Sequence, residues 1–115
     1  MARPSLSDNL VRNAAQLEQR RQLGDHLDVP RRVEHSGTFR TKRSAATAAS
    51  ELRQLGYEVE LRPVPLRTMV EAKKMERLDE DEPNRFVAQI FDVFDRNKGT
   101  YGGWGGTIVT PDTQR

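Results

Sequence analysis

Two stretches of the chain alternate apolar and polar residues, which is the pattern of a strand with one buried face. In residues 31–40, RRVEHSGTFR, the side chains of Val33, His35 and Phe39 fall on one face, and charged or hydroxyl side chains take the other. Residues 57–62, YEVELR, repeat the pattern, with aromatic or aliphatic residues at every odd position. We therefore predict two half-buried strands, and the other elements must complete a sheet around them.

The N-terminal segment has helical periodicity. Residues 7–24 begin at Ser7, a residue type that caps helix N-termini, and stop at Gly24. Their apolar stripe is narrow and runs through Leu10 and Leu17. We predict a helix that docks loosely on the rest of the chain or binds a partner.

The remaining segments complete a regular order. Residues 41–56 and 78–99 are predicted helices, and the second has the widest apolar face of the chain. Residues 67–78, RTMVEAKKMERL, favour a helix by composition, but their apolar residues form no stripe. We predict a strand there, paired with residues 57–62 in a hairpin. Residues 105–109, GGTIV, are the predicted last strand.

The elements thus run helix, then strand–helix–strand–strand–helix–strand. A four-stranded antiparallel sheet with two helices on one face is the ferredoxin-like plan, an α+β fold. We predict an N-terminal helix in residues 1–24, a ferredoxin-like domain in residues 25–110 and a tail in residues 111–115.

The composition excludes several classes of protein. The 115 residues include no cysteine, so disulfides, thiolate zinc sites and cysteine nucleophiles are excluded, in keeping with a cytoplasmic protein. No apolar stretch approaches the roughly 20 residues of a membrane span. The net charge of +2 is small, whereas proteins that bind nucleic-acid phosphates carry denser basic stripes.

No group of residues has the pattern of a catalytic or metal centre. His26 lies near Asp25 and Asp28, but this trio lacks a closing ligand. The acidic run 79–82 lacks the spacing of a calcium loop and is expected to cap a helix. We expect His35 to be partly buried and hydrogen-bonded. The sequence predicts a protein that is not an enzyme and has no cofactor and no metal.

Residues 100–109, TYGGWGGTIV, place four glycines around the only tryptophan. A phosphate-binding loop needs glycines that lead into a helix, and these follow one. The favoured interpretation is a structural motif in which glycines permit unusual backbone while the indole packs over the sheet edge. A tryptophan that anchors a partner is the other interpretation kept. The motif comprises Tyr101, Gly102, Gly103, Trp104 and Gly105.

The outward-facing residues of the first two strands form a mixed-charge surface. We predict that a protein partner binds this surface together with the tryptophan motif. The predicted partner-binding residues are Arg32, Glu34, Arg40, Glu58, Glu60, Tyr101 and Trp104. The alternatives are an RNA-binding module that uses residues 31–32 and 40–43, and a dimer that senses a small ligand. RNA-binding sheets display aromatics on the open side, but here the aromatics point inward.

Three sequence stretches together resemble one known family: RRVEHSGTF, AATAASELRQLGYEVEL and LDEDEPNRFVAQIFDVFDRNKGTYGGWGG. The chain is similar over residues 29–109 to the regulators of ribonuclease E activity B, protein inhibitors of ribonuclease E. Tyr101, Gly103, Trp104 and Gly105 match the closing motif of this family, and Gly56 with Tyr57 match its helix-to-strand joint.

The resemblance implies a ferredoxin-like protein of the bacterial cytoplasm that binds an RNA-degrading enzyme of the ribonuclease E type and modulates cleavage without chemistry of its own. It supplies no catalytic residues. The best-known members are strongly acidic, as suits docking on an arginine-rich segment, whereas this chain is slightly basic. No oligomeric state follows from these features.

Overall fold

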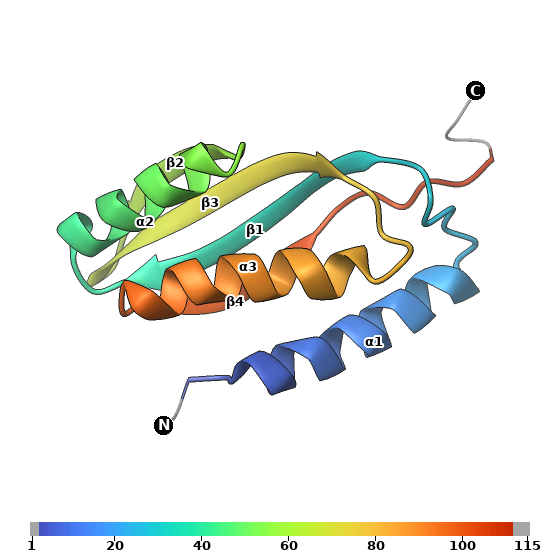
Figure 1. Ribbon diagram of the computed structural model, residues 1–115, viewed down its shortest axis with the longest axis horizontal. Coiled ribbons are helices and arrows are strands. Elements are labelled where there is room, and N and C mark those ends of the chain that lie inside the picture. The colour runs from blue at the N-terminus through green and yellow to red at the C-terminus, as the bar shows by residue number, and fades with distance from the viewer. Residues whose placement is uncertain (1–2, 112–115) are drawn as a thin grey trace.

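The structure, a computed structural model, describes residues 3–111 and has the predicted α+β order (Figure 1). The elements are α1 (Leu6–Gln22), β1 (Arg31–Phe39), α2 (Lys42–Gln54), β2 (Glu58–Val64), β3 (Arg67–Glu76), α3 (Glu82–Arg96) and β4 (Thr100–Gly105). The strands form one antiparallel sheet in the order β2-β3-β1-β4. A helix followed by β-α-β-β-α-β is the predicted topology, which the structure confirms.

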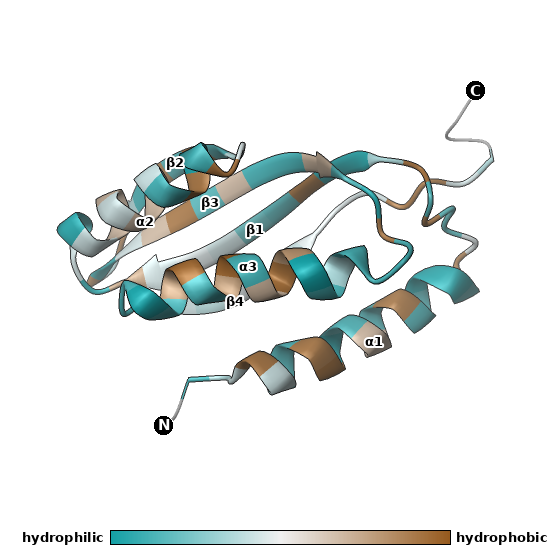
Figure 2. Cartoon of the chain, viewed as in Figure 1, coloured by the Kyte–Doolittle hydropathy of each residue, from teal (hydrophilic) through white to brown (hydrophobic). Residues whose placement is uncertain are grey.

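The two helices α2 and α3 cover one face of the sheet, and α1 runs beside α3 beyond the edge strand β4 (Figure 1). The core lies between these helices and the sheet, where the buried residues of α2 and α3 pack, and Figure 2 shows apolar residues recurring along α3. Phe39, Leu52, Ile90 and Phe94 are fully buried there. Within residues 3–111, no helix covers the opposite face of the sheet (Figure 1).

The segment whose composition favours a helix is strand β3, as predicted. Its positions 70 and 72 hold Val70 and Ala72, which are fully buried under the helices, and the sheet pairs β3 with both β1 and β2. Burial on alternate positions outweighs the helix propensity of alanine, lysine and methionine. The tip of the hairpin is Leu66, which is 97% exposed.

The prediction for the last strand is wrong in position. The strand is Thr100–Gly105, not residues 105–109. Backbone beyond Gly105 is bound by arginine side chains: Arg20 donates to the carbonyl of Gly106, and Arg31 donates to that of Thr107. These carbonyls therefore find partners without a neighbouring strand, and the β-branched residues do not extend the sheet.

The first helix differs from its prediction in its start and its buried face. Ser5, not Ser7, is the N-cap, in a capping box with Asp8. The buried residues of α1 are Asn9, Asn13 and Arg20. Hydrogen bonds from this polar face dock the helix, and Leu6 and Leu17 also pack against the core, so the apolar stripe predicted from the sequence identifies only part of the docking face.

Candidate functional site

The uncovered face of the sheet, called the open face from here on, is polar. Its side chains come from alternate positions of β1, β2 and β3, because residues paired across neighbouring strands lie on the same side of a sheet. The members are Arg32, Glu34, Ser36, Thr38, Glu58, Glu60, Arg62, Met69, Glu71, Lys73 and Met75. The structure thus brings together four of the predicted partner-binding residues, namely Arg32, Glu34, Glu58 and Glu60.

One carboxylate of the open face has no cationic partner. Arg32 pairs with Glu58, and Arg62 pairs with Glu71. Glu60 stands directly opposite Glu71 across β2 and β3, and it forms no ion pair within the described part of the chain. Like charges opposite one another in an antiparallel ladder repel. Glu60 therefore leaves surplus negative charge on the edge strand β2 of the open face.

The other three predicted partner-binding residues lie elsewhere. Arg40 is exposed just beyond the end of β1. Tyr101 is only 4% exposed and places its hydroxyl 3.1 Å from Nδ1 of His35 in the core. Trp104 points away from the open face, and its indole Nε1 donates to Oδ1 of Asn13 at 2.8 Å. Neither aromatic ring lies on the open face.

The indole of Trp104 joins α1, α3 and β4. It packs edge-on against Phe86 of α3, with ring centroids 5.2 Å apart. On the α1 side, the guanidinium of Arg20 lies 5.3 Å from its centroid. Asn13 accepts the indole hydrogen bond and donates its own Nδ2 to Asn84 of α3 at 3.0 Å. These contacts fasten α1 beside the sheet.

The glycines of β4 accommodate a bulge. Ser36 pairs with Gly103, but the next residue, Gly37, pairs with Tyr101, so Gly102 is the extra residue. Gly103 has φ of +126°, which side chains rarely adopt. A Cβ at Gly102 would lie 3.2 Å from the carbonyl oxygen of Ser36.

The helix-to-strand joint also uses a left-handed backbone. Gly56, which follows α2, has φ of +93°. Tyr57 comes next and is 4% exposed, with its hydroxyl donating to Oε1 of Glu76 at 3.2 Å. Gly56 thus lets the chain turn from α2 toward β2.

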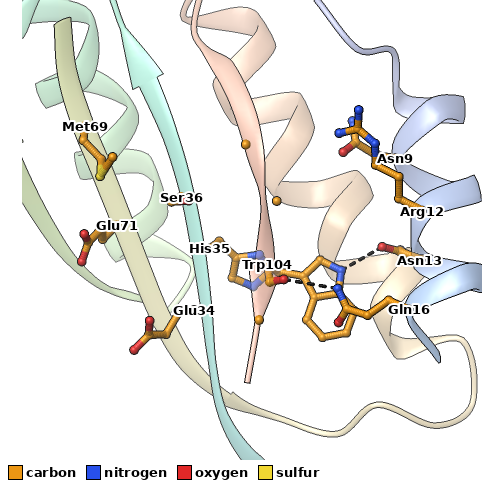
Figure 3. A pocket seen from close by; sticks show the side chains of 13 residues that line it. Asn9, Arg12, Asn13, Gln16, Glu34, His35, Ser36, Met69, Glu71 and Trp104 are labelled. Atoms are coloured by element: carbon orange, nitrogen blue, oxygen red, sulfur yellow. Dashed lines mark hydrogen bonds between the residues drawn. The ribbon is translucent and has the colours of Figure 1, made fainter. Parts of the chain in front are cut away.

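A cleft of about 480 Å³ lies between α1 and the open face (Figure 3). It is called the α1 cleft below. Side chains of α1 form one wall, β1 and β3 form the other, and β4 runs along it. Its lining residues are Asn9, Arg12, Asn13, Gln16, Glu34, His35, Ser36, Met69, Glu71, Gly102, Gly103, Trp104 and Gly105.

We compared the chain with models of known protein families. The family model described as Regulator of ribonuclease activity B matches residues 12–106. The chain belongs to this family. The match covers the whole sheet, α2, α3 and most of α1, and it confirms the family resemblance read from the sequence. No curated protein matches the chain.

Membership in the regulator of ribonuclease activity B family bears on what the open face and the α1 cleft bind. The family is named for the regulation of a ribonuclease, not for a reaction of its own. In this member, most of the residues that face outward from the sheet in the matched region are charged, and Ser36, Thr38, Met69 and Met75 are the uncharged ones in the open face as defined above. The matched region also contains the complete tryptophan motif, Tyr101–Gly105.

The sequence analysis missed a buried ion triad, which Arg20, Asp25 and Arg31 form. Asp25 accepts from Arg31 at 2.5 Å and from Arg20 at 3.0 Å. It also accepts from the backbone N–H of Val109 at 3.1 Å. Arg31 is 3% exposed, so it does not offer the basic surface that the RNA-binding alternative placed at residues 31–32.

The triad keeps Asp25 ionised. Burial by itself would raise the pKa of this carboxyl, but hydrogen bonds from Arg31, the Val109 N–H and Arg20 outweigh burial, so the pKa is lowered. The one feature of the sequence that points to this triad is the short separation of Asp25 and Arg31 along the chain. Asp25 also lies beside His26 and Asp28, so the sequence suggested a different grouping.

His35 is buried and hydrogen-bonded in this family member. Its Nε2 lies 3.3 Å from Oε1 of Glu76, which also accepts from the hydroxyl of Tyr57, and its Nδ1 lies 3.1 Å from the hydroxyl of Tyr101. Burial lowers the pKa of the imidazole, although Glu76 opposes this shift. Burial likewise raises the pKa values of both tyrosines.

Two further findings concern residues 3–111. No group of three histidine, aspartate or glutamate side chains among them is placed to hold a metal ion. None of their helices has the length and apolar character needed to cross a membrane.

Proposed function

We propose that this chain binds a ribonuclease E-type enzyme of the bacterial cytoplasm through its open face and inhibits RNA cleavage by protein–protein contact, with no reaction of its own. The observation that carries the proposal is the unpaired carboxylate of Glu60 on the exposed sheet of a ribonuclease-regulator family member. In this proposal residues 25–110 form the recognition domain, and residues 1–24 supply the helix beside it.

The charges of the open face favour a protein partner with cationic side chains. A guanidinium or ammonium of the partner would pair with Glu60 and relieve its repulsion with Glu71. Arg32 and Glu58 already pair with each other, so they are better suited to exclude wrong partners than to add affinity.

The positions of the arginine, carboxylate and aromatic side chains argue against the RNA-binding alternative. That alternative relied on residues 31–32 and 40–43, but Arg31 is buried and engaged with Asp25. Carboxylates on the open face repel phosphates, and base stacking needs exposed aromatic rings, whereas Tyr57 points into the core. The remaining basic stretch, residues 40–43, lies at one end of β1.

The test is a charge reversal with a matched control. Glu60→Arg on β2 is expected to weaken binding of the ribonuclease E-type enzyme at least tenfold, about 1.4 kcal/mol, because it turns an attractive site for a cation into a repulsive one. Asp95→Arg makes the same change of charge at an exposed position of α3, on the helix side of the sheet. Binding is measured by calorimetry with the purified enzyme.

The control is expected to bind like the wild-type chain, and both variants to keep its melting temperature within a few degrees. Equal binding by the two variants would remove the open face from the proposal. No binding of the enzyme by the wild-type chain, or retention of RNA in its place, would contradict the proposed function itself.

A further inference from the structure

One glycine of β4 is not explained by the fold. Gly103 needs its positive φ, and Gly102 sits close to the carbonyl of Ser36. Gly105 has no such φ, and a Cβ built on it would meet no atom within 4 Å. Glycine in a strand costs stability, because it loses more backbone entropy than other residues and packs no side chain. A glycine that neither backbone nor packing requires often marks a place where a ligand or another backbone approaches closely.

Gly105 lines the α1 cleft. Glycines also occupy positions 102 and 103, so β4 presents bare backbone along the cleft, with the polar side chains of α1 opposite (Figure 3). Asn13 and Gln16 point toward Trp104 and hold the lower end of the α1 wall in place. The cleft is therefore a groove between the glycine-rich strand β4 and the helix α1, which hydrogen bonds hold in place.

The charged groups of the two walls are opposite in kind. Arg12 of α1 forms no hydrogen bond or ion pair within the described residues, and its guanidinium only donates. On the sheet side, Glu34 has only a long contact with Lys73, at 3.7 Å, and its carboxylate only accepts. A ligand that satisfies both walls must offer acceptors to Arg12 and donors to Glu34.

An extended polypeptide meets this requirement. Its backbone carries carbonyl acceptors and N–H donors on both sides, and a bare glycine strand lets it lie close. RNA or a free phosphate would meet the carboxylates of Glu34 and Glu71 along the sheet wall. Phosphate groups offer acceptors to Arg12 but no donor to these carboxylates, so a peptide is the occupant that suits both walls.

We propose that the α1 cleft binds an extended peptide segment, which lies over Gly103 and Gly105 between Arg12 and Glu34. This inference rests on the proposed function in one respect: the segment belongs to the ribonuclease that the open face contacts. The cleft then determines which peptide sequence is recognised, while the carboxylate of Glu60 attracts cationic side chains of the ribonuclease.

The first experiment does not depend on the ribonuclease. Random 12-residue peptides displayed on phage are selected against the immobilised full chain, and enriched peptides are titrated by fluorescence anisotropy. We expect Gly105→Val to weaken their binding at least tenfold without lowering the melting temperature, because valine suits a strand and nothing crowds its Cβ. Ser50→Val, at an exposed position on α2, is the control and is expected to bind like the wild type.

The second arm separates this inference from the proposed function. Gly105→Val and Glu60→Arg are both titrated with the ribonuclease E-type enzyme, and weakening by both supports the cleft and the open face together. Weakening by Glu60→Arg alone overturns the peptide cleft and leaves the proposed function standing. If the enzyme does not bind at all, the proposed function falls, and the peptide selection decides the cleft. Failure to enrich any peptide, or enriched peptides that bind Gly105→Val within twofold of the wild type, overturns the inference.

Discussion

Replacing Asp25 with alanine is expected to lower the free energy of unfolding by about 3–5 kcal/mol, the effect of removing one partner from a buried ion pair. The side chain of Asp25 is fully buried, and it accepts from both Arg20 and Arg31. Without it, two guanidinium groups remain in the interior with no carboxylate partner, and only backbone carbonyls and the side-chain oxygen of Gln16 accept from them among the described residues. Urea unfolding followed by circular dichroism measures the loss.

The matched control is Asp28→Ala, an exposed aspartate of the same loop, for which a change within about 0.5 kcal/mol is expected. Acid provides a second readout. Because the folded pKa of Asp25 lies below its unfolded value of about 3.9, its contribution is present above that value and is lost as the pH falls through the folded pKa. The stability difference between the wild type and Asp25→Asn is therefore expected to shrink below about pH 4. A constant difference, or an Asp25→Ala protein as stable as the control, would contradict the triad.

Gly37→Ala is expected to destabilise the fold by about 3 kcal/mol or more, at the upper end for overpacked cores. A Cβ at this position would lie 2.0 Å from Cε2 of Phe94 and 2.5 Å from the backbone carbonyl oxygen of Thr100. The ring is fully buried, and the carbonyl belongs to β4, so neither moves without disturbing the sheet. Thermal unfolding measures the effect.

Gly105→Ala serves as the comparison, since it adds the same methyl group where there is open space. We expect its melting temperature to equal or exceed that of the wild type, because alanine reduces the entropy of the unfolded chain. If both glycines tolerate alanine equally, the close packing of β1 against α3 and β4 is not as the structure shows it.

The fold was predictable because its strands and helices carry clear periodicity. The alternation around Val33 and Phe39 reports burial directly, and both residues are fully buried. The stripe of α3, from Phe86 to Phe94, likewise marks the core face. Patterns of this kind arise because apolar burial dominates the stability of these elements.

The predictions failed where polar groups determine the structure. Asn13 and Arg20 dock α1 through hydrogen bonds, and apolar periodicity does not report such contacts. Residues 107–109 are β-branched, yet the arginines of the triad bind the carbonyls at 106 and 107. Buried polar networks join residues far apart in the chain, and one sequence gives no signal for which partners meet.

The candidate site was predicted in part. Alternation along β1 and β2 placed Arg32, Glu34, Glu58 and Glu60 on one face, because the period of a strand fixes which side each residue takes. The α1 cleft was not predicted, because it depends on how α1 docks. Trp104 belongs to that docking, and its hydrogen bond to Asn13 spans 91 positions of the chain.

We propose that the open face and the α1 cleft, not the helix layer, contact the ribonuclease. Chemical-shift mapping of the backbone amides, with the purified ribonuclease E-type enzyme added stepwise, locates the contact residue by residue. We expect the largest changes at Glu34, Glu60 and Gly105, and no change at Ser50 of α2 or Asp95 of α3, which are exposed on the helix layer. Changes confined to α2 and α3 would rule out the proposed contact surface.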